Sequence, residues 1–317
     1  MVEYVIEKWS SEIFTVTIGA TKEEGGTRNK TIKIGGQKTL PFLNCDGVIP
    51  YKPIIAAEVI DYLPEELWPT FYEHFKDIVS DPIKWIKEIE KSEPDVICIR
   101  LLSCHPDIKN NSKDYLSTFI PEVLKTTQLP LIILGCGHIE KDTEILPFVC
   151  ELTKNEKVLI GMAVKENYKT IALSAFASGH SVIAETPLDI NLAKQLNILI
   201  NDIGIPLDRI VMHHTTGGLG YGFEYCYSIM ERCRLAGLQG DKVMATPIIN
   251  LISEEVWKTK EAKVKPEEEP NWGKSTIERA KIWEISTALG YLQAGADILV
   301  LSHPDSIKSL KSIIKNI

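Results

Sequence analysis

The feature that most restricts the fold of this sequence is a repeated alternation of short apolar runs with longer amphipathic stretches. The apolar runs are nearly continuous, which is typical of strands buried on both faces of a parallel sheet. Stretches with helical spacing of apolar residues lie between them, for example at 81–92, 114–127, 191–204 and 275–295. The apolar runs themselves lie at 53–61, 95–103, 131–137, 158–164, 181–187, 209–217, 242–249 and 297–304.

About eight strand-then-helix units in a chain of 317 residues predict a (β/α)₈ TIM barrel that forms a single domain over residues 1–317. The alternative is a doubly wound open sheet, but the glycine fingerprint of such a sheet does not follow the run at 53–61. Two β-rich runs around a Gly-rich polar turn occupy residues 12–38. They predict a β-hairpin, so we treat residues 1–40 as an N-terminal extension of the barrel.

Charge and cysteine usage exclude several classes of protein. The net charge is −8, from 35 basic and 43 acidic residues, which argues against general nucleic-acid binding. Seven cysteines without a CxxC pair read as reduced thiols and argue against an iron–sulfur cluster or structural zinc held by this chain. No signal peptide and no apolar run of membrane-spanning length is apparent, so we expect a cytoplasmic protein that binds no membrane.

A charged segment at 254–273 interrupts the alternation after the seventh apolar run. It contains two prolines and has Trp257 and Trp272 near its ends. A long loop of this kind in a compact domain is often a lid or a contact surface, and the alternative is a plain solvated loop.

Polar residues follow most of the predicted strands, at the end of a barrel where chemistry takes place. Neighbouring residues of a strand point to opposite sides, so His213 and His214 cannot easily bind one metal ion, and we predict no metal site. No GxSxG motif occurs, and we assign no catalytic residue. Glu58 and Glu185 remain open as an acid–base pair or as hydrogen-bonded structural carboxylates.

Four glycines, at 217, 218, 220 and 222, precede a helical pattern in the segment TTGGLGYG. Backbone N–H groups at such a place can bind an anion. The segment lacks the Gly-Lys-Ser/Thr ending of a Walker motif and matches GxGxxG poorly. By itself it indicates only a backbone that comes close to something.

The stretch TTGGLGYGFEYCYSIMERCRLAGLQGD at 215–241 resembles the barrel subunits of the corrinoid iron–sulfur protein family of the reductive acetyl-CoA (Wood–Ljungdahl) pathway. PIIAAEVID at 53–61 and HPDSIKSLK at 303–311 are similar to that family as well, and the resemblance runs from about residue 10 to the end. The large subunit of the family carries a four-cysteine domain, and this chain has no cysteine cluster. The chain therefore resembles the small subunit, in the acetyl-CoA decarbonylase/synthase delta-subunit family.

The resemblance implies a heterodimer in which the barrel mouth covers a corrinoid (cobalamin) shared with the large subunit, which also holds a [4Fe-4S] cluster. A methyl group would move from methyltetrahydrofolate methyltransferase to CO dehydrogenase/acetyl-CoA synthase. The chain would be a non-catalytic subunit. Its expected corrinoid-binding residues are Arg100, Ser103, Gly135, Glu185, His214, Thr215, Thr216, Gly217, Gly218, Gly220 and Ser302.

Two alternatives remain open. A pterin-dependent methyltransferase barrel acting on methyltetrahydrofolate would present Asp and Asn at several strand ends. Here the second to fourth strands end in RLLS, LGCG and MAVK, without that set. The other alternative is an unrelated barrel enzyme that uses Glu58 or Glu185 as a base.

Overall fold

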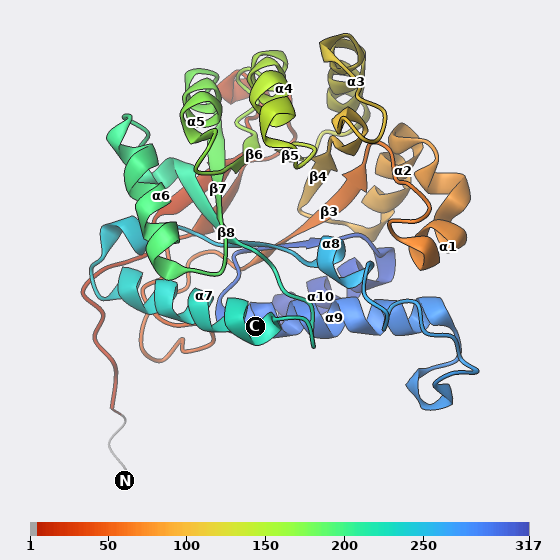
Figure 1. Cartoon of the computed structure of the whole chain (residues 1–317). Helices are drawn as coiled ribbons and strands as arrows, with labels where there is room; N and C mark the ends of the chain where they lie inside the picture. Colours follow the sequence, from red (N-terminus) through yellow and green to blue (C-terminus); the bar gives the residue numbers. More distant parts are fainter. Residues whose placement is uncertain (1–4, 317) are drawn as a thin grey trace.

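The computed structural model describes residues 5–316 and has eight parallel strands that alternate with helices around a barrel (Figure 1). The predicted (β/α)₈ fold is confirmed. Around the barrel the strands follow the order β8-β7-β6-β5-β4-β3-β10-β9. Their bounds are β3 (Ile54–Ile60), β4 (Val96–Arg100), β5 (Leu131–Leu134), β6 (Leu159–Ala163), β7 (Ser181–Thr186), β8 (Ile210–His214), β9 (Ile249–Leu251) and β10 (Ile298–Leu301).

The helices cover the outside of the barrel, and several begin at polar caps. Asp81, Asp189 and Ser275 each accept hydrogen bonds from backbone N–H groups in the first turn of the helix that follows. None of the described helices has the length and apolarity needed to cross a membrane. Their bounds are α1 (Pro69–Val79), α2 (Pro82–Ile89), α3 (Lys113–Thr126), α4 (Ile139–Leu152), α5 (Tyr168–Ala177), α6 (Ile190–Asp202), α7 (Phe223–Leu238), α8 (Ile252–Val256), α9 (Thr276–Ala294) and α10 (Pro304–Lys315).

The seventh strand differs from its prediction. Of the run at 242–249, only Ile249 belongs to β9, and residues Lys242–Met244 form a 3-10 turn instead. Pro247 has no N–H to donate to a neighbouring strand, and the N–H of Ile248 donates to the carboxylate of Asp297. β9 is therefore short, and a single bridge between Met212 and Ile248 closes the barrel between β8 and β9.

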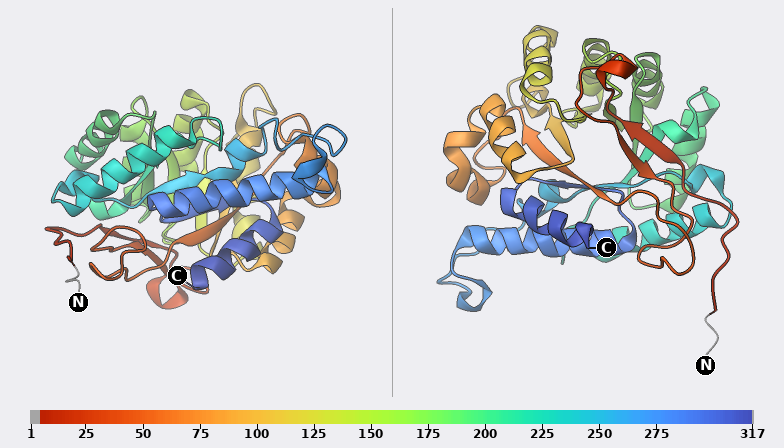
Figure 2. Two further views of the ribbon diagram at one scale, coloured as in Figure 1. Left: turned by 90° about the horizontal axis from the view of Figure 1, so that it is seen from below. Right: turned by 180° about the vertical axis from the view of Figure 1, so that it is seen from behind.

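The predicted N-terminal hairpin is also confirmed, as β1 (Thr15–Ile18) and β2 (Ile32–Gly35). Val16, Ile18 and Ile34 pack against the apolar side chains inside the barrel. Figure 2 shows the hairpin lying across the barrel when the molecule is seen from behind. The hairpin thus covers the end where the strands begin, and the carboxyl ends of the strands form the open mouth.

The segment at 254–273 divides into a core part and a surface part. Its first residues belong to α8, and the buried indole of Trp257 donates to Glu284 of α9 over 2.9 Å. The remainder projects beyond the start of α9 in Figure 1. The guanidinium of Arg279 holds this projection by donating to backbone carbonyls of Lys265 and Gly273, over 2.8 and 2.9 Å. Its role as a lid stays a prediction.

Candidate functional site at the barrel mouth

Alternation along the strands selects which polar side chains face the inside of the barrel at its mouth. Side chains two positions apart in a strand share a face, so a polar residue that comes two positions after an apolar residue of the barrel interior also faces the inside. The residues that this rule places above the apolar interior are Glu58, Arg100, Glu185, His213 and Ser302, after Ala56, Cys98, Ile183, Val211 and Val300.

Arg100 lies between two carboxylates. Its Nε donates to Glu58 Oε1 over 2.7 Å, and its Nη2 lies 2.9 Å from Glu254 Oε2. Ser253 also donates its hydroxyl to Glu58. Burial lowers the pKa of Arg100, but the charges of Glu254 and Glu58 raise it by more, so the guanidinium stays charged.

Glu185 and His213 form the second charged contact, with 3.3 Å between Glu185 Oε1 and His213 Nδ1. The imidazole is almost fully buried, whereas 31% of the Glu185 side chain is exposed. Burial raises the pKa of Glu185, but the contact with His213 and the charge of Arg100 lower it by more, and the net direction is down. Glu185 is therefore an ionised carboxylate at the mouth.

His214 lies elsewhere, and its role as a corrinoid-binding residue stays a prediction. Its fully buried ring points toward α7, where Nε2 lies 3.5 Å from Cys233 Sγ. Burial lowers the pKa of His214 to about 3, so this imidazole is neutral. His214 is a packing residue between the strands and the helices, and His213 is the member of the pair at the mouth.

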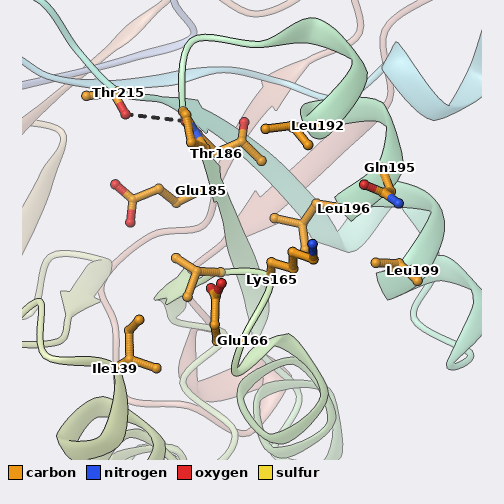
Figure 3. A pocket seen from close by; sticks show the side chains of 12 residues that line it. Ile139, Lys165, Glu166, Glu185, Thr186, Leu192, Gln195, Leu196, Leu199 and Thr215 are labelled. Atoms are coloured by element: carbon orange, nitrogen blue, oxygen red, sulfur yellow. Dashed lines mark hydrogen bonds between the residues drawn. The ribbon is translucent and has the colours of Figure 1, made fainter.

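Two adjoining cavities open at the mouth. The central cavity, of about 260 Å³, is lined by Arg100, Leu134, Gly135, Gly137, Ile139, Asp142, Met162, Val164, Asn167, Glu185, Leu251 and Glu254. The α6 cavity, of about 410 Å³, has Leu192, Leu196 and Leu199 of α6 on one side, and Figure 3 shows the Glu185 carboxylate directed away from these leucines. Because Ile139, Val164 and Glu185 line both cavities, Glu185 stands between them.

The glycine segment, which we define as residues 215–222, combines fixed and open positions. Thr216 is buried and accepts the N–H of Leu251 over 3.0 Å, and Gly217 bonds to the phenol of Tyr291. Thr215 and Gly220 are exposed, and Gly218 is buried, although a side chain at either glycine would meet no close contact. The φ of Gly220 is +76°, a left-handed value that favours glycine.

Ser103, Gly135 and Ser302 make close contacts within the chain at the mouth, and their corrinoid binding stays a prediction. The N–H of Ser103 donates to Asp61 over 2.8 Å, and burial raises the pKa of Asp61 to about 6. Gly135 lies so close to Asp142 that a Cβ there would come within 2.3 Å of Oδ1. The N–H of Ser302 donates to Glu284, and its buried hydroxyl has no hydrogen-bond partner among the described residues.

The structure adds residues that the sequence did not single out. Glu254, Asp142 and Asn167 line the central cavity, and the leucines of α6 line its neighbour. Alternation in β8 was a usable signal for His213, whereas the others depend on how distant segments meet. Within residues 5–316 no group of three or more His, Cys, Asp or Glu side chains is placed to hold a metal ion.

Large apolar side chains are exposed around the mouth. We define the mouth rim as five residues that follow the ends of β3, β5, β7 and β8 and are 37% to 63% exposed. Exposed apolar groups that gather around polar cavities are typical of binding surfaces. The rim consists of Tyr62, Ile139, Leu192, Tyr221 and Tyr225.

Comparison with known proteins gives one family over most of the chain. The family described as "CO dehydrogenase/acetyl-CoA synthase delta subunit" matches residues 15–314. The acetyl-CoA decarbonylase/synthase complex subunit delta of Archaeoglobus fulgidus is 33% identical, over 98% of this chain and 70% of that protein. Subunit delta 2 of Methanosarcina acetivorans is 35% identical, over 98% of this chain and 72% of that protein.

Solved structures with a similar fold include dihydropteroate synthases. The enzyme from Coxiella burnetii, in complex with pteroic acid, has a TM-score of 0.55 and 12% identity over 87% of this chain and 97% of its own. The enzyme from Thermus thermophilus has a TM-score of 0.54 and 11% identity over 88% of this chain and 100% of its own. At this identity the likeness concerns the barrel fold alone.

Proposed function

The chain belongs to the CO dehydrogenase/acetyl-CoA synthase delta subunit family, and we propose that it is a non-catalytic subunit whose barrel mouth covers a corrinoid. In this proposal the corrinoid lies between the mouth and the large subunit of a corrinoid iron–sulfur heterodimer. The methyl group moves from methyltetrahydrofolate:corrinoid methyltransferase to acetyl-CoA synthase. When bound, the corrinoid supplies the cobalt that carries this group, and the chain supplies position and shelter.

The observation that carries the proposal is the mouth rim. Its exposed apolar side chains follow four of the strands, at the same end of the barrel as the central cavity, so a partner that covers the rim would remove the apolar groups from water and enclose the polar ones. Tyr221 and Tyr225 contribute rigid side chains of the type enriched at interfaces. A broad ligand held between two proteins fits a mouth of this kind.

The residues at the mouth suit contact with one face or edge of a corrin better than enclosure of the whole ring. The central and α6 cavities, of about 260 and 410 Å³, are at the scale of a side chain or a small ligand, so the corrin ring would lie across the mouth. Polar groups that keep some exposure at the mouth include the guanidinium of Arg100 and the hydroxyl of Thr215. A guanidinium and hydroxyls suit the amide-bearing edge of a corrin.

The carboxylates at the mouth support a positioning role over acid–base chemistry. Glu58 is fully buried and committed to Arg100 and Ser253. Glu185 has a lowered pKa, which makes it a weak base near neutral pH. The chain's own residues therefore bind, orient and exclude water.

Assembly with the large subunit tests the proposal. We expect the co-expressed pair to co-purify with a corrinoid absorption spectrum, and Tyr225→Asp to weaken assembly at least about tenfold, as for a hot-spot residue. Phe176→Asp is the matched control, because Phe176 is an exposed aromatic residue on α5, outside the rim. Methyl transfer from methyltetrahydrofolate to free cobalamin by the isolated chain would contradict a non-catalytic role.

A second candidate function is pterin-dependent methyl transfer. It is favoured by the central cavity, where Asp142, Asn167 and Glu185 bring together the carboxylate and amide groups that grip a pterin ring. However, Asp142 already accepts the N–H groups of Cys136 and Gly137, over 2.7 and 3.0 Å. Tight binding of methyltetrahydrofolate to the isolated chain, with turnover, would favour this second function.

A further inference from the structure

We propose that the central cavity binds an amide edge, meaning a carbonyl oxygen with an N–H group beside it. The inference rests on the proposed function, because the rim of a corrin is the expected source of such amides. It goes further in naming the groups that recognise the amide, Glu185 and Arg100, and in limiting what enters the cavity to a head group.

Glu185 provides the acceptor. One of its oxygens, Oε1, lies 3.3 Å from His213 Nδ1 in an ion-pair contact without hydrogen-bond geometry, and the other makes no hydrogen bond to the described residues. The carboxylate is partly exposed and lines the cavity. A carboxylate oxygen whose lone pairs are free beside a cavity can accept a hydrogen bond from an N–H or O–H donor. Hydrogen bonds to charged groups are stronger than those between neutral groups.

Arg100 provides the donor. The bond from Nε to Glu58 fixes the plane of the guanidinium, and its fully buried Nη2 lies 2.9 Å from Glu254 Oε2. The remaining nitrogen, Nη1, makes no hydrogen bond within residues 5–316, and the Arg100 side chain keeps 13% of its exposure at the cavity. A charged N–H donor without a partner beside a cavity suits a carbonyl oxygen.

Charge and size restrict the ligand further. The carboxylates of Glu58, Glu185 and Glu254 surround the single charge of Arg100, so an anionic ligand would be repelled. An ammonium group would leave Nη1 without an acceptor. A cavity of about 260 Å³ falls below the roughly 300–1,000 Å³ typical of drug-sized ligands, so a neutral head group fits and a ring system fits only by its edge.

The apolar wall has a matching role. Leu134, Met162, Val164 and Leu251 line the same cavity and offer contacts to the carbon atoms next to an amide. A side-chain carboxamide on an apolar stem and the lactam edge of a pterin share this chemistry. The recognition is the same for both, and only competition experiments separate the two sources.

Chemical-shift titration of the full chain with propionamide tests the site, with methyl propionate and propionate as comparison ligands. We expect propionamide to bind at least about tenfold more tightly than either, since the ester lacks the N–H and the acid is repelled. Glu185→Ala should weaken propionamide binding about 10- to 100-fold. Glu166→Ala is the matched control, because Glu166 is exposed and lines only the α6 cavity, and it should change binding less than about twofold.

Several outcomes would overturn the inference. They are equal binding of the amide and the ester, unchanged affinity in Glu185→Ala, or shifts that map outside the cavity. Val164→Phe, which fills the cavity from its apolar wall, provides a second variant with the charged groups intact. It should abolish propionamide binding, and unchanged binding in this variant also counts against the site.

Competition identifies the source of the amide. Displacement of propionamide by dicyanocobinamide supports a corrin side chain, and displacement by methyltetrahydrofolate alone supports a pterin edge. The test is separable from the proposed function. Propionamide binding in a chain that fails to assemble with the large subunit supports the amide site and refutes the proposed function. Assembly without propionamide binding refutes the amide site and supports the proposed function.

Discussion

The phenol of Tyr291, on α9, holds both backbone groups of Gly217: it accepts the N–H over 2.9 Å and donates to the carbonyl over 2.5 Å. The two residues are 74 positions apart, and both are buried. A Cβ at Gly217 would come within 2.6 Å of the backbone of Gly222, so the turn closes tightly on itself. The glycine segment is therefore fixed at one end by a helix of the outer layer, and it is not a freely flexible turn.

Replacing Tyr291 with phenylalanine should loosen the glycine segment. The change leaves two buried backbone groups of Gly217 without a partner, at a cost of about 1–3 kcal/mol in the free energy of unfolding. Urea denaturation measures the cost. Tyr225→Phe is the control, because its phenol is mostly exposed, and equal stability of the two variants would contradict the role of Tyr291.

His213 and His214 should respond differently to substitution, although they are adjacent. His214→Ala empties a buried position beside Cys233 and should cost about 2 kcal/mol of stability, with the central cavity unchanged. His213→Ala removes the contact with Glu185 and should raise the pKa of that carboxyl. NMR titration of Glu185 in both variants distinguishes them, and the same pKa in each would refute the assignment.

Gly220 should matter for assembly more than for folding. Its Cβ would meet nothing within 4 Å, but its φ of +76° is costly for a β-branched residue. Gly220→Val should therefore shift the segment and reduce affinity for the large subunit, with a loss of about 1–2 kcal/mol in stability. Gly220→Asn tolerates the same φ and is the matched control. Normal assembly of the valine variant would leave the segment a plain turn.

Asp61 should make the protein more stable in mild acid. Burial raises its pKa from 3.8 to about 6, so the folded state holds the proton more tightly than the unfolded state. The stabilisation is complete below pH 3.8 and is lost as the pH rises through about 6, with a magnitude of about 3 kcal/mol. Comparison of wild type with Asp61→Asn between pH 4 and 7 should show this difference. A difference that does not vary with pH would exclude it.

Three buried histidines should act in the opposite direction. Burial lowers the pKa of His180 and His303 to about 4 and that of His214 to about 3. Their neutral forms stabilise the folded state above about pH 6.5, and this is lost as the pH falls through 4, by roughly 1 kcal/mol per pH unit and histidine. The unfolding free energy should therefore fall from pH 6.5 to 4, and less steeply in His214→Asn. An unchanged slope in that variant would show that His214 does not contribute.

Much of the fold follows from local pattern. Continuous apolar runs indicated buried parallel strands, and their number indicated a closed barrel. The seventh strand was misplaced because the run at 242–249 is mostly apolar, and the tertiary contact of Ile248 with Asp297 shows that it turns before pairing. Alternation within a strand could have favoured His213 over His214 at the mouth, but His214 was the residue predicted there.

The site was less accessible to sequence reasoning because its parts come from distant elements. Arg100 meets Glu254 only because β4 and the start of α8 reach the same end of the barrel. The α6 cavity depends on which face of that helix is turned toward β7, and Asp142 reaches the cavity from α4 by capping the turn after β5. No motif or residue spacing in the sequence indicates these contacts.

The single bridge between Met212 and Ile248 has a mechanical consequence. In the order β8-β7-β6-β5-β4-β3-β10-β9, each strand is joined to the next by a ladder of hydrogen bonds. The two end strands, β8 and β9, are joined to each other by that bridge and by the hydrogen bond from the N–H of Leu251 to Thr216. Each such bond contributes only about 1 kcal/mol net, so the circumference is most elastic there. Stretching this joint would move Leu251 away from Thr216, and because Leu251 lines the central cavity, the width of that cavity would change without loss of the other strand pairs.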